Sequence, residues 1–147
     1  MSTLIHEPEV VSPDCREESS EDEIRTRIWT VLSSLYPRGA MVERRSENRY
    51  PFPYLVRLTP VGPDGLASQG EPVVVVGKHL SERGLGFYHP KPIAHRRMIA
   101  SLEVSGGSPV ALLIDLTWCR FTRHGWYESG GKFLQAIARE ALIRGDR

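Results

Sequence analysis

An apolar residue recurs every three or four positions between residues 24 and 35, which is the spacing of one face of a helix. The members of this stripe are Ile24, Ile28, Val31, Leu32 and Leu35. Ser20 and Glu23 have the spacing of a capping box, and Pro37 cannot continue a helix, so we predict an amphipathic helix over residues 20–37. The stripe must be covered, either by the domain that follows or by a partner protein.

Beyond residue 53 the helical spacing gives way to short, β-rich segments separated by turn residues. The six segments are residues 54–61, 71–80, 84–89, 97–104, 110–122 and 126–134. Glycine and proline in the short connections favour hairpins, so we expect successive strands to pair antiparallel. Such a set of strands protects its edges by closing into a barrel or folding into a sandwich. A weak apolar face over residues 135–144 predicts a short closing helix.

The charge is divided along the chain, although the net charge is only +1. Residues 1–23 contain eight acidic residues and one arginine, for a net charge of −7, and the remainder has a net charge of +8. A segment this polar buries too little apolar surface to offset its ordering entropy, so we predict that residues 1–19 form a disordered acidic tail. The tail either shields the basic body, binds a partner or only aids solubility.

Several classes of protein do not fit this sequence. The longest apolar runs, at residues 73–76 and 110–114, are too short to cross a bilayer, so we expect no membrane span. The first residues lack the features of a secretory signal, so we expect a cytoplasmic protein. Cys15 and Cys119 occur in unlike contexts and are expected to be free thiols.

Candidate catalytic and metal-binding residues are sparse. The five histidines lack the ligand spacing of a compact zinc site, and the motifs G-x-S-x-G, H-E-x-x-H and G-x-x-x-x-G-K-[ST] do not occur, so we expect neither an enzyme nor a metal centre. Asp115 alternates with apolar residues in a strand and is expected to face solvent. The aromatic residues near 118–127 either stack nucleic-acid bases or pack the hairpin.

Arginine is the remaining candidate for binding chemistry. Arg44, Arg45 and Arg49 stand directly before the first strand segment, where their charges repel one another unless an anion or water lies between them. A second motif, H79-L-S81-E-R-G84, closes the second strand segment, and Gly84 is free to adopt backbone angles closed to other residues.

The two motifs in this order resemble those of the PilZ domain family, bacterial β-barrel receptors for the second messenger cyclic di-GMP. The family signatures are RxxxR and [D/N]xSxxG. T117-W-C-R and G130-G-K-F also look like the last two strands of the family, so the resemblance covers residues 41–145. It implies a mainly β fold, a six-stranded antiparallel PilZ-like β-barrel with an N-terminal helix and a short C-terminal helix.

The resemblance also implies roles for individual residues. Arg45 and Arg49 match the motif arginines, which lie on a loop that wraps the ligand against the barrel. Ser81 matches the motif serine near phosphate, and Gly84 matches the glycine that lets the backbone approach. Arg44 precedes the motif, where family members with arginine tend to take a stacked pair of ligands.

His79 departs from the family pattern, which has Asp or Asn at this position to accept hydrogen bonds from guanine. A neutral imidazole has one acceptor nitrogen, and a protonated imidazole has none. Two hypotheses follow: the chain binds cyclic di-GMP, or it is a degenerate adaptor that acts through protein contacts alone.

The expected function is therefore a non-enzymatic cyclic di-GMP receptor with no other cofactor. In this interpretation the loop of residues 41–53 is mobile when empty and folds over the ligand, which signals to an unidentified downstream protein. A barrel that uses its basic body to bind single-stranded nucleic acid ranks below both hypotheses.

Overall fold

The computed structural model describes residues 13–36, 49–62 and 70–138. Its elements are α1 (Pro13–Leu35), β1 (Tyr50–Pro51), β2 (Leu55–Pro60), β3 (Val73–Leu80), β4 (Gly84–His89), β5 (Arg97–Leu102), β6 (Val110–Phe121) and β7 (Tyr127–Ala136). Each of the strands β2 to β6 lies within one of the predicted segments, and β7 begins within the sixth and extends two residues beyond it. Arg44 and Arg45 lie outside the described residues.

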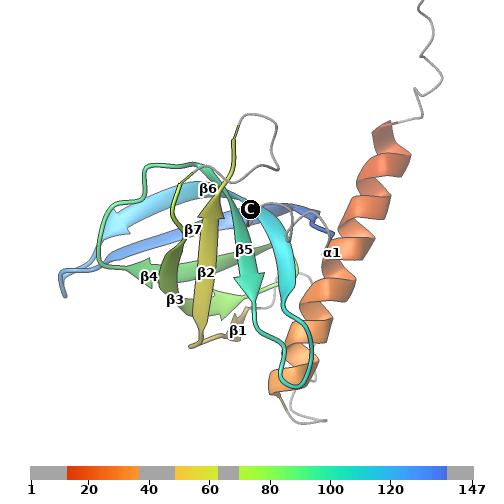
Figure 1. Ribbon diagram of the computed structural model, residues 1–147, viewed down its shortest axis with the longest axis horizontal. Helices are drawn as coiled ribbons and strands as arrows, with labels where there is room; N and C mark the ends of the chain where they lie inside the picture. Colours follow the sequence, from red (N-terminus) through yellow and green to blue (C-terminus); the bar gives the residue numbers. More distant parts are fainter. Residues whose placement is uncertain (1–12, 37–48, 63–69, 139–147) are drawn as a thin grey trace, which may run out of the picture.

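Six strands close into an antiparallel barrel (Figure 1). The strand order is β3-β2-β5-β6-β7-β4, and β4 pairs with β3 to complete the ring. The short strand β1 pairs with the last two residues of β3, and β2 pairs with the first four residues of β3 along the same edge. The predicted fold class, a mainly β protein with a six-stranded antiparallel barrel and an N-terminal helix, is confirmed.

The barrel interior follows the alternation of apolar residues along the strands. Val56 and Leu58 of β2, Val75 of β3, and Leu85 and Phe87 of β4 are buried in one hydrophobic cluster. Alternate positions on the same strands point outward, because successive side chains of a strand face opposite sides of the sheet. The outer face is therefore where ligand-binding side chains can be displayed.

Helix α1 packs against the barrel through its apolar stripe. Ile24, Ile28, Val31 and Leu32 are buried and belong to the same cluster as the barrel core. Figure 1 shows α1 along one side of the barrel, away from the turn that joins β6 to β7. Of the two alternatives for this stripe, the structure shows packing on the domain that follows.

Two predicted boundaries differ from the structure. α1 begins at Pro13, so Ser20 lies inside the helix and does not cap it, and residues 13–19 are helical. Proline suits a first helical position because its missing N–H would have no partner within the helix. At the other end, β7 continues to Ala136, so no closing helix begins at Gln135, and residues from 139 lie outside the described part of the chain.

Among the described residues, no helix has both the length and the apolar character needed to cross a membrane.

Candidate functional site

The second motif forms a tight turn between β3 and β4. The backbone N–H of Ser81 donates to the carbonyl oxygen of Gly84 at 2.9 Å. The Ser81 Oγ accepts hydrogen bonds from the backbone N–H groups of Arg83 at 3.2 Å and Gly84 at 3.1 Å. Ser81 is buried, so its hydroxyl first of all fixes the shape of this turn.

Gly84 is required by packing. Its φ is not positive, so the expected use of special backbone angles is wrong. A Cβ at this position would lie 2.1 Å from the carbonyl oxygen of Gly131 on β7, a distance that no side chain tolerates. The glycine therefore lets β4 and β7 approach each other.

His79 lies on the outer face of β3, opposite Gly86 of β4 and next to a register shift in the β3–β4 ladder. A Cβ at Gly86 would lie 2.6 Å from the imidazole Cε1, so the ring covers this glycine. Burial lowers the pKa of His79, and the charges of Arg49 and Lys78 lower it further against an opposing effect of Glu128. The imidazole is therefore neutral at neutral pH and keeps one acceptor nitrogen.

Arg49 is the residue of the first motif that the structure places near the second motif. It is exposed and directly precedes β1, which pairs with β3 at Leu80 and His79. Its charge is close enough to affect the pKa of His79. The structure thus brings Arg49, His79, Ser81 and Gly84 to the same end of β3.

A row of outward-facing residues continues from His79 across the barrel. His79 pairs with Gly86, Gly86 with Gly130, and Gly130 with Trp118. A Cβ at Gly130 would lie 2.5 Å from the Trp118 Nε1, so the indole covers this glycine as the imidazole covers Gly86. Two rings, one of them 43 % exposed, therefore flank a pair of adjacent glycines on the outer surface.

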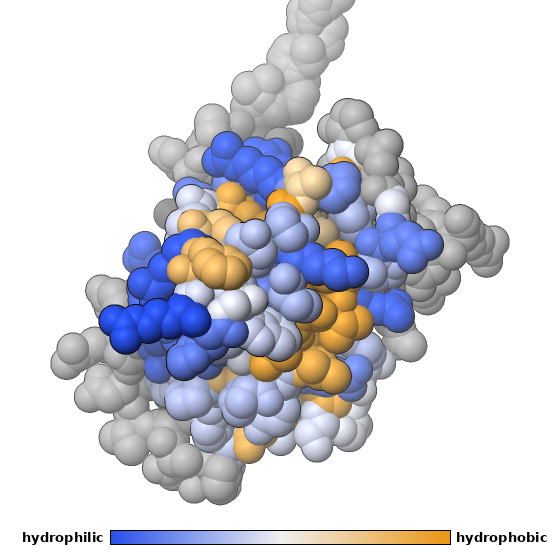
Figure 2. All heavy atoms as spheres, turned by 90° about the vertical axis from the view of Figure 1, so that its left-hand side faces the viewer, coloured by the Kyte–Doolittle hydropathy of each residue, from blue (hydrophilic) through white to orange (hydrophobic). Residues whose placement is uncertain are grey.

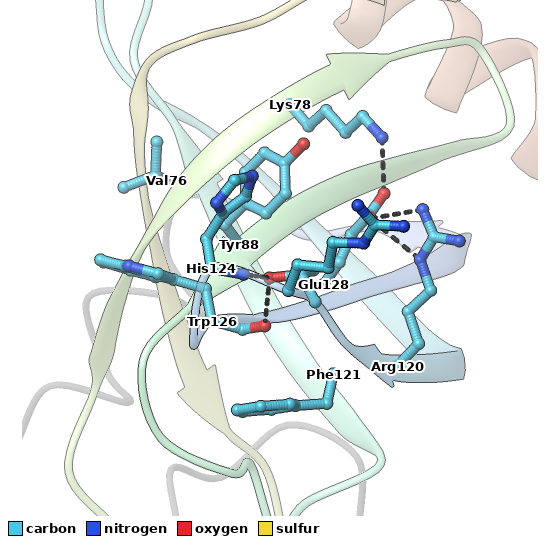
Figure 3. A pocket seen from close by; sticks show the side chains of 10 residues that line it. Val76, Lys78, Tyr88, Arg120, Phe121, His124, Trp126 and Glu128 are labelled. Atoms are coloured by element: carbon cyan, nitrogen blue, oxygen red, sulfur yellow. Dashed lines mark hydrogen bonds and ion pairs between the residues drawn. The ribbon is translucent and has the colours of Figure 1, made fainter.

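The next row lines a pocket of about 690 Å³ (Figure 3). In this row Val76 pairs with Tyr88, Tyr88 with Glu128, and Glu128 with Arg120. The remaining lining residues are Lys78, Phe121, Thr122, Arg123, His124 and Trp126. Figure 2 views the side of the barrel opposite α1 and shows hydrophobic patches beside strongly hydrophilic side chains.

Glu128 connects two cations at this pocket. Its Oε2 accepts a hydrogen bond from the Lys78 Nζ at 2.6 Å, and its Oε1 accepts from the Arg120 Nη2 at 2.8 Å and Nε at 3.1 Å. The bond from Lys78 is the largest cause that lowers the pKa of Glu128, and Arg120 adds to it against the opposing effect of burial. The carboxylate therefore stays ionised although its side chain is only 4 % exposed.

Helix α1 contacts the motif turn directly. The Arg25 Nε donates to the Oε1 of Glu82 at 3.1 Å, and the Trp29 Nε1 donates to the Oε2 of the same carboxylate. Trp29 also packs edge-on against Tyr50 of β1, with ring centroids 5.7 Å apart. The helix therefore contacts both β1, which follows Arg49, and the turn that follows β3 and His79.

A second buried carboxylate lies outside the pocket. Asp115 is buried, contrary to the expectation that it faces solvent. Its Oδ1 and Oδ2 accept hydrogen bonds from the Arg96 Nε at 2.8 Å and Nη2 at 3.2 Å. These bonds lower the pKa of Asp115 and explain how a carboxylate is tolerated there. No group of three or more metal-ligating side chains occurs in the part of the chain that the structure describes.

Sequence reasoning named Arg49, His79, Ser81 and Gly84 but missed the roles of Lys78, Arg120 and Glu128. The signal for these three residues is the strand register, which places residues from β3, β7 and β6 together on the outer face. The register was not fixed by any motif in the sequence.

Comparison with known proteins gives one distant structural likeness. No protein-family model matches the chain, and no curated protein matches it in sequence. A crystal structure of MrkH from K. pneumonia is similar, with a TM-score of 0.41 and 13 % sequence identity. The likeness covers 71 % of this chain and 47 % of that one, so the chain spans about half the length of MrkH.

Proposed function

We propose that the chain is a non-enzymatic, cytoplasmic receptor for cyclic di-GMP. The observation that carries this proposal is the meeting of Arg49, His79 and the Ser81–Gly84 turn at one end of β3. These residues come from the two sequence motifs that resemble those of PilZ domains. The six-stranded barrel is the architecture that the resemblance implies.

The chemistry of this cluster suits a guanine dinucleotide. A guanidinium group forms paired hydrogen bonds with phosphate oxygens or with O6 and N7 of guanine, and Arg49 is exposed and available for either. The neutral imidazole of His79 offers one nitrogen to accept a hydrogen bond from a guanine N–H. The indole of Trp118, in the same outer-face row, offers a surface on which a base can stack.

Arg44 and Arg45 complete the proposed site, although both lie outside the described residues. We assign them to the ligand because they precede Arg49 in the sequence and belong to the first motif. Binding then changes the surface shown to a downstream protein. The contacts of Arg25 and Trp29 with Glu82 give α1 a direct connection to the motif turn.

Calorimetric titration with cyclic di-GMP tests the proposal, with GMP and cyclic di-AMP as controls for selectivity. The wild-type protein should show saturable binding selective for cyclic di-GMP. The substitution Arg49→Ala should weaken binding about tenfold or more, because it removes a guanidinium group from the anion. Arg57→Ala is the matched control, since Arg57 is also exposed but lies on β2.

The contradicting result is a wild-type protein that binds no cyclic di-GMP in calorimetry or in equilibrium dialysis with labelled ligand. That result would favour the degenerate adaptor, which acts through protein contacts alone. Equal binding by Arg49→Ala and wild type would remove Arg49 from the site.

A further inference from the structure

The pocket beside the motif cluster combines cationic and aromatic side chains. Three permanent cations line it, Lys78, Arg120 and Arg123, against the single carboxylate of Glu128. This balance leaves a positive charge that favours an anionic occupant. The pocket lies one outer-face row away from His79, and Lys78 is the sequence neighbour of that histidine.

Aromatic rings form the other part of the pocket wall. Figure 3 shows Glu128 between Lys78 and Arg120, with the rings of Trp126 and Phe121 on the other side. Trp126 and Phe121 are 40 % and 64 % exposed, so a ligand can reach both residues. Tyr88 lies under Lys78, with the Nζ 5.6 Å from the ring centroid. A planar, anionic ligand satisfies both parts of this lining.

We propose that this pocket binds one guanine nucleotide half of the ligand, while the Arg49–His79 cluster binds the other half. This inference rests on the proposed function. Arg120 contacts O6 and N7 of the base or an adjacent phosphate oxygen, and the base stacks on Trp126. Glu128 is a positioning residue, because it holds Lys78 and Arg120 by hydrogen bonds on its two carboxylate oxygens.

The spacing of the strands agrees with a ligand that has two halves. His79 lies on β3 and Arg120 on β6, separated in the sheet by β4 and β7. Three strand spacings correspond to about 14 Å along the sheet. A macrocycle with a purine base on each side can bridge such a span, and it would pass over the rings of His79 and Trp118, which cover the Gly86–Gly130 pair.

The chain supplies its own control for Arg120. Arg96 also binds a buried carboxylate through its Nε and Nη2, and the two arginine side chains are similarly exposed, at 67 % for Arg120 and 72 % for Arg96. The two arginines differ in their surroundings, because Arg120 lines the pocket and Arg96 does not. A loss of a surface ion pair alone should therefore affect both substitutions alike.

The experiment compares cyclic di-GMP binding by wild type, Arg120→Gln and Arg96→Gln, with thermal unfolding of each variant as a folding check. Arg120→Gln should bind about tenfold or more weakly, and Arg96→Gln should stay within about twofold of wild type. If Arg120→Gln unfolds, Arg120→Lys replaces it, because lysine keeps the charge and loses the planar fork.

Equal affinities of the Arg120 and Arg96 variants overturn the inference. If Arg49→Ala has lost affinity in the same series, the receptor function still stands. A wild-type protein that binds no cyclic di-GMP overturns both the function and the inference.

Glu128→Gln tests the positioning role by the sign of its effect. The substitution removes a negative charge from the pocket, so a purely electrostatic role predicts tighter binding of an anion. A positioning role predicts weaker binding, about threefold or more, because the amide no longer anchors both cations. Unchanged or tighter binding by the folded variant would contradict it.

Discussion

Two buried carboxylates on the outer face of the barrel, Asp115 and Glu128, form nearly the same hydrogen bonds with an arginine. Each accepts hydrogen bonds from the Nε and Nη2 of an exposed arginine, and the pKa of each is lowered by its cationic partners. Asp115 is also within 3.6 Å of Arg97, which neighbours Arg96 in sequence. Glu128 takes its second cation, Lys78, from a different strand.

The comparison teaches that the local geometry of an ion pair does not by itself reveal its role. At Asp115 both cations come from adjacent positions at the start of β5, so the contact holds β5 to β6. At Glu128 the cations come from β3 and β6, and aromatic residues of the β6–β7 hairpin complete a pocket around them. The inference that one half of the nucleotide binds in this pocket depends on this second arrangement.

The largest effect is expected from removing an aromatic residue of the pocket beside Glu128. Trp126→Leu should weaken cyclic di-GMP binding by about 1–3 kcal/mol, because a base loses its stacking surface. Trp126→Phe keeps an aromatic face and should retain most of the affinity. Calorimetric titration of both variants measures the difference, and equal losses in the two would show that the base does not stack there.

A smaller effect is expected on stability in acid, and it should be shared by both regions. The folded-state pKa values of Glu128 and Asp115 lie below their ordinary values of 4.5 and 3.8, so each contributes stability above its ordinary value that is lost as the pH falls through the folded value. Each contribution is at most about 1 kcal/mol, because water screens the exposed cationic partners.

Urea unfolding of wild type, Glu128→Gln and Asp115→Asn across this pH range measures those contributions. The free energy of unfolding of each variant should fall less steeply with acidification than that of wild type. Parallel curves for all three proteins would mean that neither ion pair contributes to stability.

The smallest effect concerns His79. Its lowered pKa keeps the imidazole neutral from about pH 7 to pH 8, so cyclic di-GMP affinity should be nearly constant over that interval. Titrations at the two pH values, repeated with His79→Asn, measure this. A clear rise in affinity at the lower pH that is absent in His79→Asn would mean that the protonated imidazole binds the ligand.

The barrel could be predicted from the sequence because each strand segment carries its own alternation and its own turn residues. The helix start could not, because Ser20–Glu23 has the spacing of a cap although Pro13 is also a good first residue. Motif residues such as His79 and Ser81 could be recognised for the same reason as the strands, because they lie close together in the sequence.

The pocket could not be predicted because it depends on how distant strands align. The β6–β7 ladder shifts register between Leu113 and Ile114 and again between Leu116 and Trp118. A slip of one residue moves every side chain to the other face, so the sequence alone leaves open whether Trp118, Arg120 and Glu128 point outward together.

The contact of Glu82 with Arg25 and Trp29 joins α1 to the turn that carries Ser81 and Gly84, so a shift of the helix that breaks this contact also acts on the turn. Thermodynamic linkage then works in both directions. A protein that binds α1 and draws Trp29 away from Glu82 would change the affinity for the nucleotide by the same factor by which the nucleotide changes the affinity for that protein. Nucleotide affinity measured on the chain alone would then be a property of the unpartnered state, and the value in a complex would report the strength of the coupling.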